Sequence, residues 1–217
     1  GQDLDDDGEI GLSLSTLTSS KYDSNGWLLK KEIDSSGNTK GLYIVNNAEE
    51  SSSLISIKDE WGYQVSLDWN SSWGYGSSSS IAQAVEKNTD GTFSLAVKST
   101  NSYDSSSTST DWTIYEISSD GTFKWNDSTY TADIKFYETS LFLDDLNDDG
   151  SVGIDFSKLN DISTDTFSET LKYDEDQVYY IYTPEGKYLP VIEEWGDPAK
   201  LSESYSWSDG NFSSTPV

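Results

Sequence analysis

The sequence predicts a mostly β protein of the α+β class, in which antiparallel β-sheet modules repeat along the chain. Three observations favour this fold. Aromatic and β-branched residues alternate with polar residues in several short segments, as in half-buried strands. Asn-Gly, Ser-Gly and Asp-Gly turn signals separate these segments at short intervals. An acidic, glycine-containing loop occurs twice, at residues 3–11 and 145–153.

The amino-acid composition explains how so polar a chain can fold. Leu, Ile, Val and Phe make up about a fifth of the residues, close to the ~20% below which chains tend to be disordered. The 14 Tyr and 8 Trp residues add apolar area, since each large aromatic side chain buries roughly 150–250 Å². We therefore expect an aromatic-rich core beneath a Ser, Thr and Asp surface.

The charge and the missing residue types exclude several classes of function. The net charge is −26, which argues against binding to nucleic acid or anionic lipid. The chain contains no His and no Cys, so Ser-His-Asp catalysis, thiolate catalysis and disulfides are excluded. No segment approaches the ~20 apolar residues of a membrane span, and we expect no membrane insertion.

Strands are expected where apolar or aromatic residues alternate with polar ones. The clearest case is residues 63–69, which are expected to form a half-buried strand in which Tyr63, Val65, Leu67 and Trp69 alternate with polar residues. Glu60-Trp61-Gly62, just before it, is expected to be a turn with a core Trp. The other expected strands lie at residues 27–33, 41–46, 54–57, 93–97, 112–117 and 123–125, with a short strand or turn at 12–17.

Other segments carry weaker or different signals. Residues 71–80 and 101–110 are rich in Ser and are expected to be loops. Residues 81–85 fit a short helix or a strand equally well. Residues 134–142 place Ile134, Tyr137 and Leu141 at helical spacing, which predicts a short helix before the second acidic loop.

The loop at 145–153 has the residue pattern of the first half of an EF-hand or dockerin-like calcium loop. Side-chain oxygens occur at loop positions 1, 3 and 5, on Asp145, Asn147 and Asp149. Gly150 follows at the sharp turn, and Ser151 is expected to offer its main-chain carbonyl. Such a cluster of hard oxygens suits Ca²⁺, which takes six to eight oxygen ligands. The alternative is a solvated acidic turn.

The rest of the calcium shell is not specified by this loop. An EF-hand has a bidentate Glu at position 12, where this loop has Phe156. Glu138, in the predicted helix, is either a supplementary metal ligand or an acid on the helix face. Val152, at position 8, is expected to point into the core and anchor the loop.

The first copy of the loop has the same spacing. Asp3, Asp5 and Asp7 occupy positions 1, 3 and 5, and Glu9 occupies position 7. Leu14 replaces the Glu of position 12. The duplication favours a metal loop over a chance run of acids, so we expect Ca²⁺ at both copies.

Other short segments also recur and indicate a tandem array. Residues 179–182 correspond to 42–45, Glu194-Trp195-Gly196 to Glu60-Trp61-Gly62, and 204–207 to 66–69. We expect residues 1–142 to form a first repeat module that begins with a calcium loop. Residues 143–217 then contain the second loop and the first half of a second, truncated repeat.

A series of short motifs follows in a fixed order along residues 41–153. They are Gly41-Leu42-Tyr43-Ile44, the loop around Trp73, Asp90-Gly91-Thr92-Phe93, Trp112-Thr113-Ile114-Tyr115, Ser119-Asp120-Gly121-Thr122-Phe123 and the DxNxDG loop at Asp145. In this order they resemble the tryptophan-rich tandem repeats of large cyanobacterial and proteobacterial secreted or surface proteins. The resemblance implies an extracellular or cell-surface setting and bound Ca²⁺, with no established catalytic activity. Asp148 stands where that family commonly has Gly, and the strand Trp residues are fewer than in typical members.

These features predict a non-enzymatic, calcium-binding structural or adhesive module whose partners are neighbouring repeats and a surface polysaccharide or another cell-surface protein. The alternative is a carbohydrate-binding module in which Trp69, Trp73 and Tyr75 contact glycan, although these aromatics are also expected to cap the β core. A glycosidase is the weakest hypothesis, because nothing places Glu60 opposite a second acid.

Overall fold

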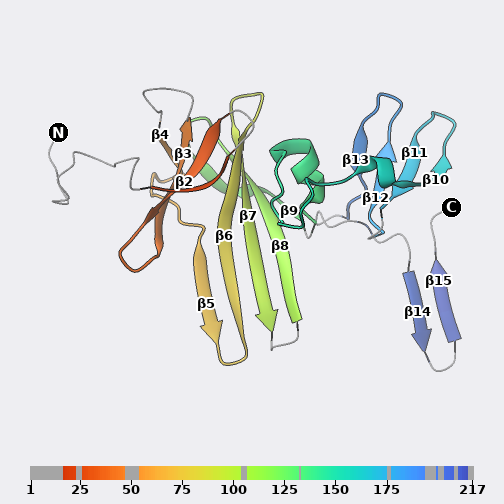
Figure 1. Cartoon of the computed structure of the whole chain (residues 1–217), viewed down its shortest axis with the longest axis horizontal. Coiled ribbons are helices and arrows are strands. Elements are labelled where there is room, and N and C mark those ends of the chain that lie inside the picture. Colours follow the sequence, from red (N-terminus) through yellow and green to blue (C-terminus); the bar gives the residue numbers. More distant parts are fainter. Residues whose placement is uncertain are drawn as a thin grey trace.

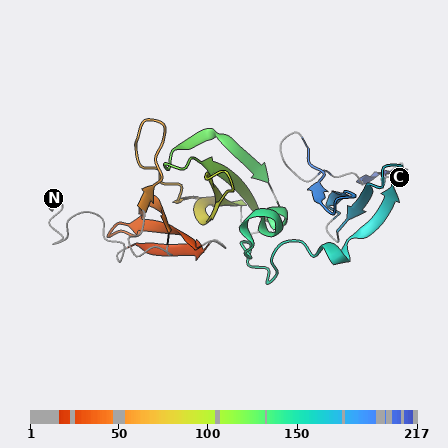
Figure 2. The same ribbon diagram turned by 90° about the horizontal axis from the view of Figure 1, so that it is seen from above.

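The protein is almost entirely antiparallel β-structure in the part that the structure describes, which confirms the predicted β-rich class (Figures 1 and 2). The helical segments there are short: α1 (Lys135–Tyr137), the π-helical turn η2 (Glu138–Phe142) and the 3-10 turn η3 (Phe156–Lys158). The computed structural model describes residues 17–22, 26–46, 54–103, 107–131, 133–174, 177–193, 199, 203–207 and 210–214.

The first sheet contains β1 (Thr18–Tyr22), β2 (Trp27–Ile33), β3 (Thr39–Asn46) and β4 (Leu54–Ser56), in that order. Its central strands form because each contains a run of buried apolar residues, 27–29 in β2 and 42–45 in β3, and a tight turn joins the two strands. Leu29 of β2 lies directly opposite Ile44 of β3, and both side chains are fully buried.

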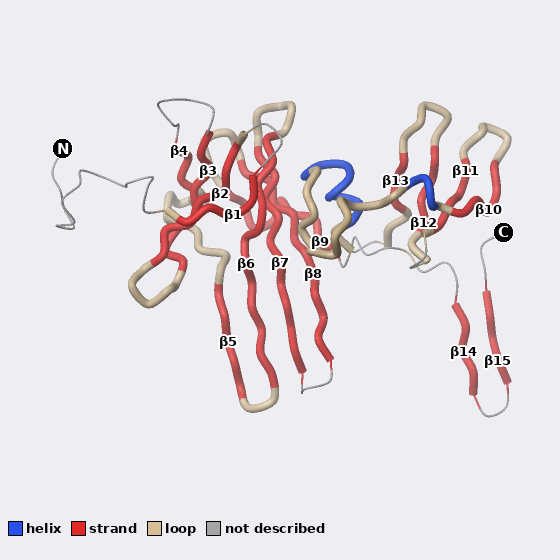
Figure 3. The backbone as a smooth tube through the Cα atoms, in the orientation of Figure 1, coloured by secondary structure: helices blue, strands red, loops and turns tan. Residues whose placement is uncertain are grey.

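The second sheet has five longer strands: β5 (Trp69–Trp73), β6 (Gly76–Lys87), β7 (Phe93–Tyr103), β8 (Ser107–Ile117) and β9 (Phe123–Thr131). One half of this sheet is apolar and packs on both faces. The other half is rich in Ser and Thr, and Figure 3 shows it extending beyond β1–β4 as a single layer.

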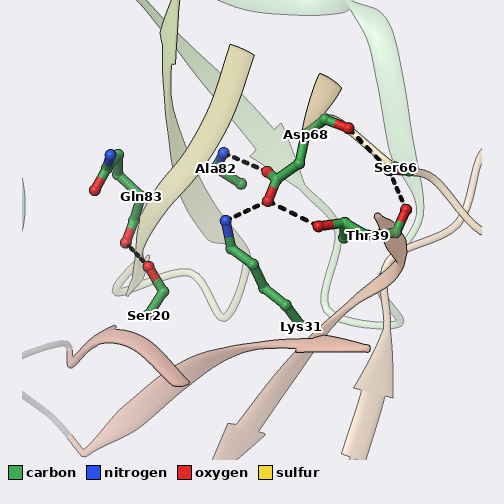
Figure 4. Close-up of polar contacts among 7 residues, drawn as sticks. All are labelled: Ser20, Lys31, Thr39, Ser66, Asp68, Ala82 and Gln83. Atoms are coloured by element: carbon green, nitrogen blue, oxygen red, sulfur yellow. Dashed lines mark hydrogen bonds and ion pairs between the residues drawn. The ribbon is translucent and has the colours of Figure 1, made fainter. Parts of the chain in front are cut away.

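The main core lies between these two sheets. Trp27 packs edge-on against Phe93, with the ring centroids 5.0 Å apart. Asp68 joins the layers: it pairs with Lys31, accepts from Thr39 Oγ1 at 3.0 Å and accepts from the backbone N–H of Ala82 at 2.7 Å (Figure 4). The buried cluster also contains Leu29, Leu42, Ile44, Ile57, Val65, Leu67, Val85, Leu95, Val97, Ile117 and Phe123.

The helical turns α1 and η2 cover the opposite face of the five-stranded sheet. Trp112 and Ile114 of β8 contribute to this second cluster from the sheet. Ile134, Phe142 and Leu146 contribute from the helical turns and the acidic loop, and Leu146 is fully buried. The acidic loop is therefore attached to the sheet through its own apolar side chain.

Beyond the acidic loop the chain forms a third sheet and a separate hairpin. The sheet contains β10 (Asn160–Thr164), β11 (Thr170–Tyr173), β12 (Tyr179–Tyr182) and β13 (Tyr188–Pro190), in that order. The hairpin consists of β14 (Glu203–Trp207) and β15 (Gly210–Ser214).

One type of turn recurs through the described chain. In each case the N–H of the first residue donates to the carbonyl of the fifth, and the N–H of the fourth donates to the carbonyl of the first. The fourth residue has a positive φ, usually as Gly, but as Ser168 (67°) and Gln177 (65°) in two turns. This is a type I turn closed by a left-handed residue. The turns lie at residues 34–38, 59–63, 88–92, 118–122, 165–169, 174–178 and 183–187.

Several predictions for the N-terminal half need correction. Residues 71–80 and 101–110 are not simple loops, because they lie largely in the paired strands β5–β8. In residues 63–69, Val65 and Leu67 are buried as predicted, but Tyr63 and Trp69 on the same predicted face are exposed. The segment forms only an isolated bridge at Gln64 before β5 begins, so its alternation does not continue as a half-buried strand. The turn at 59–63 is present, yet Trp61 is 73% exposed and is not a core residue. Residues 81–85 are strand.

Candidate metal centre

The acidic loop at 145–153 turns its oxygen-bearing side chains inward onto its own backbone. Asp145 accepts hydrogen bonds from the N–H of Asp149 (3.2 Å) and of Gly150 (2.9 Å), one on each carboxylate oxygen. Oδ1 of Asn147 accepts from the same N–H of Asp149 at 2.9 Å, and Oδ1 of Asp149 accepts from the N–H of Ser151 at 2.9 Å. Loop positions 1, 3 and 5 therefore converge on one segment of backbone.

The donor set of this loop fits a hard cation. Asp145 and Asn147 share one N–H partner, and Nδ2 of Asn147 donates to Asp149 at 3.1 Å, so the three side chains are neighbours. Carboxylate, amide and carbonyl oxygens suit Ca²⁺. Within the described residues, no three Asp or Glu side chains form a metal-holding group by themselves. A complete shell would therefore need Asn147, the carbonyl of Ser151 and water.

Glu138 fastens both ends of the loop to η2. Its side chain is fully buried. Oε1 accepts from the backbone N–H groups of Leu146 (2.7 Å) and Asn147 (2.9 Å), and Oε2 accepts from that of Gly153 (3.0 Å). Glu138 is thus not a solvent-facing acid, and its role as a metal ligand stays a prediction.

The electrostatics of Glu138 reflect its position. Burial raises the pKa of Glu138 above its usual 4.5, and the charge of Asp145 acts in the same direction. The three backbone N–H donors act against this shift, because hydrogen bonds to a carboxylate favour its charged form. These donors therefore offset part of the cost of burying the group.

A second set of contacts fixes the end of the loop. Thr139 Oγ1 accepts from the N–H of Ile154 at 2.7 Å and donates to the carbonyl of Lys135 at 3.2 Å. Gly153 has φ of 61°, and an added Cβ would lie 2.0 Å from Thr139 Oγ1. Only glycine fits where the loop passes this close to the helical turn.

The apolar anchors of the loop differ from the prediction. Val152 is 51% exposed, so it does not point into the core. Leu146, within the loop, and Ile154, just after it, are buried in its place. The positive φ angles at Gly150 and Gly153 redirect the backbone, so Val152 faces outward.

The first acidic loop cannot be described in the same way. Asp3, Asp5, Asp7 and Glu9 lie outside the described residues, as does any helix before that loop.

The predicted glycan-contacting aromatics are exposed and do not cap the core. Trp69 and Trp73 lie on the same face of β5 and are 50% and 44% exposed, and Tyr75 in the following turn is 81% exposed. Tyr103 of β7, which the sequence did not single out, lies 6.3 Å from Trp73 between ring centroids. Gly76 pairs with both Trp73 and Tyr103, and an added Cβ there would lie 3.1 Å from the Trp73 ring.

Comparison of the chain with protein-family models, curated proteins and solved structures gives no significant match. None of the helices in the described ranges is long and apolar enough to cross a membrane. The residues of the loop and of the sheets therefore provide the basis for a function.

Proposed function

We propose that this protein is a non-enzymatic, calcium-binding structural and adhesive repeat module of a large extracellular or cell-surface protein. The observation that carries the proposal is the inward-turned loop at 145–153, where the side-chain oxygens of Asp145, Asn147 and Asp149 become neighbours. Glu138 fastens this loop to η2, which packs on the five-stranded sheet.

The loop occupies the joint between two sheets of the chain. It follows the five-stranded sheet and precedes β10. The conformation of the loop therefore determines how the chain passes from the five-stranded sheet to the sheet β10–β13. Asp145 and Asp149 place like charges close together in a chain of net charge −26, which favours an open loop. Bound Ca²⁺ supplies compensating positive charge and accepts six to eight oxygens.

Hydrogen bonds within the loop support this proposal. The N–H groups of Asp149, Gly150 and Ser151 orient the side-chain oxygens of loop positions 1, 3 and 5. Asp3, Asp5, Asp7 and Glu9 form the second proposed site. The proposed partners are neighbouring repeats and a surface polysaccharide or another cell-surface protein, with no role for nucleic acid.

Calcium titration tests this proposal. Protein treated with a chelator should bind Ca²⁺ in isothermal titration, and Asp149→Asn should weaken one site by about tenfold or more, or about 1.4 kcal/mol. Asp148→Asn removes the same charge from a non-ligand position and is the matched control. Mg²⁺ should substitute poorly, because it requires a smaller octahedral shell. A chelated protein that takes up no Ca²⁺ would overturn the proposal.

A carbohydrate-binding function is the second candidate, favoured by the exposed aromatics of the single-layer half of the sheet. Trp69, Trp73 and Tyr103 offer ring surface beside the hydroxyl-rich strands, and Asn101 accepts from Ser78 Oγ at 2.5 Å on the same face. Aromatic faces with nearby polar groups suit neutral sugars. Glycan-array binding that is lost in Trp73→Ala but kept in Trp61→Ala, an exposed aromatic in the turn at 59–63, would support it.

A further inference from the structure

The sheet β10–β13 repeats the pairing of β1–β4 residue by residue. Leu171 lies opposite Ile181 as Leu29 lies opposite Ile44. Ile181 in turn lies opposite Leu189, as Ile44 lies opposite Ile55.

The equivalence continues past the last strand of each sheet. The N–H of Val191 donates to the carbonyl of Tyr179 at 2.8 Å, and that of Ala199 donates to Val191 at 2.9 Å. In the first sheet the N–H of Ile57 donates to Leu42 at 2.9 Å, and that of Val65 to Ile57 at 3.1 Å. The two sheets are therefore built to one plan.

One face of β1–β4 is completely covered. Leu29, Ile44 and Ile57 are 0% exposed, because the five-stranded sheet packs over them with Phe93, Leu95 and other apolar residues of the main cluster. The covering layer thus removes this face from water.

The corresponding face of β10–β13 lacks that degree of cover. Leu171, Ile181 and Val191, the counterparts of three fully buried residues, are each partly exposed. Leu189 is 48% exposed.

The opposite face of β10–β13 already has packing partners. Phe156 of η3 stacks on Tyr188 with the centroids 3.9 Å apart, and it lies 6.4 Å from Tyr180. Tyr188 also packs against Tyr182. The apolar face with Leu171 and Ile181 is therefore the one that can still receive a layer.

The hairpin β14–β15 repeats the beginning of the five-stranded sheet. Trp207 lies opposite Gly210 as Trp73 lies opposite Gly76, and Glu203 lies opposite Ser214 as Trp69 lies opposite Ser80. This register matches Trp207 with Trp73, which corrects the match with Trp69 expected from the sequence. In Figure 1 the hairpin extends below β10–β13 as β5 and β6 extend below β1–β4.

We infer that the Leu171–Ile181–Val191 face of β10–β13 is a docking surface for a five-stranded antiparallel sheet of the β5–β9 type, of which β14 and β15 are the first two strands. The partner is recognised by apolar residues in the positions of Val85, Phe93, Leu95 and Ile117. This inference rests on the repeat organisation in the proposed function, and it names the layer that one repeat needs.

The experiment supplies a layer of this type after Val217. Val217 takes the place of Gln83 in the matched register, so a second copy of residues 84–142 is joined directly after Val217. Hydrogen exchange at the amides of Leu171, Tyr179 and Ile181 should slow by about tenfold or more relative to the original chain. The control is the same extension with Ser in place of the added copies of Phe93, Leu95 and Ile117, which should not slow exchange.

Two outcomes of the exchange measurement would overturn the inference. Unchanged exchange at these amides, whether or not the added strands become ordered, would overturn the inference. Equal slowing by the Ser-substituted extension would also overturn it, because apolar docking would not be the cause. Calcium titration of the original chain tests the proposed function separately, since it does not involve the added strands.

Discussion

Glu138, which precedes the acidic loop, and Gly153, the last residue of that loop, are joined by a hydrogen bond of 3.0 Å from the glycine N–H to Oε2. The same carboxylate accepts from Leu146 and Asn147 through its other oxygen. One buried side chain thus closes the loop at both ends. The conformation of the candidate metal loop therefore depends on a residue outside it.

Replacing Glu138 by Gln should destabilise the fold. Gln has one acceptor oxygen in place of two, so at least one of the three backbone N–H groups would lose its partner. An unsatisfied buried donor costs about 1–3 kcal/mol. Chemical unfolding without Ca²⁺ measures this loss. The control is Glu116→Gln, which changes an exposed residue of β8. It should alter the free energy of unfolding by less than about 0.5 kcal/mol. Equal effects of the two changes would show that the three hydrogen bonds contribute nothing.

Gly153→Ala should be more damaging than Gly150→Ala. Both residues have positive φ, at 61° and 89°. An added Cβ at Gly150 meets nothing within 4 Å, whereas at Gly153 it would overlap Thr139 Oγ1 and approach the Lys135 carbonyl to 2.5 Å. Backbone strain alone is worth about 1–2 kcal/mol.

Thermal unfolding of the two variants separates strain from overlap. The loss in Gly153→Ala should exceed that in Gly150→Ala. The loss should be smaller when Gly153→Ala is made in a Thr139→Ala background and compared with Thr139→Ala alone, which accounts for the hydrogen bonds of Thr139 Oγ1. A Gly153→Ala loss of the same size in both backgrounds would rule out overlap with Thr139 Oγ1 as the cause.

The strands with apolar alternation could be predicted because their signals are local. Residues 93–97 and 112–117 combine period-2 patterns with turn residues, and residues 27–33 follow an Asn-Gly turn signal with an apolar run. All three segments are strands. The Ser-rich parts of β5–β8 carry no such signal. They are strands because they continue the ladders of apolar segments, so their pairing depends on distant residues.

The candidate site shows the same limit. The spacing of Asp145, Asn147 and Asp149 predicted a loop in which these side chains converge, because the spacing itself brings them together. The burial of Glu138 depends on how η2 packs on the five-stranded sheet, which no local pattern shows. The prediction that Val152 points into the core was wrong for a similar reason. The neighbouring turn at Gly153 depends on the close approach of Gly153 to Thr139, a residue outside the loop.

Replacing Ser168 by Gly should stabilise the β10–β11 hairpin. Ser168 is the left-handed residue of its turn, with φ of 67°, and most equivalent turns in the described chain have Gly there. Glycine relieves about 1–2 kcal/mol of backbone strain in the folded state. It also raises the conformational entropy of the unfolded chain, which lowers stability by about 0.4–1 kcal/mol. The net gain should be about 0.5–1 kcal/mol, measured by thermal unfolding. Gly91→Ala makes the reverse change in a turn with open space and should destabilise; a loss of stability in Ser168→Gly would refute this account.

Acid should weaken the turns through their capping carboxylates. Asp34 accepts from the N–H groups of Ser36 and Asn38, and Asp120 accepts from Ser118 Oγ and the N–H of Thr122. Hydrogen bonds from Asn38 hold the pKa of Asp34 below its usual 3.8, and those from Ser118 and Thr122 lower the pKa of Asp120.

A folded-state pKa below the unfolded value means that the stability is present at neutral pH and is lost as the pH falls through the folded value. The free energy of unfolding should therefore decrease below about pH 4. Chemical unfolding at fixed ionic strength, from pH 7 to pH 2, measures this decrease, which forms the acid limb of the stability profile. Asp120→Asn should lower stability at pH 7 and flatten the acid limb. Ser118→Ala should flatten it in the same way, because it removes the largest contribution to the lowered pKa of Asp120. An acid limb of unchanged slope in both variants would show that Asp120 does not contribute to it.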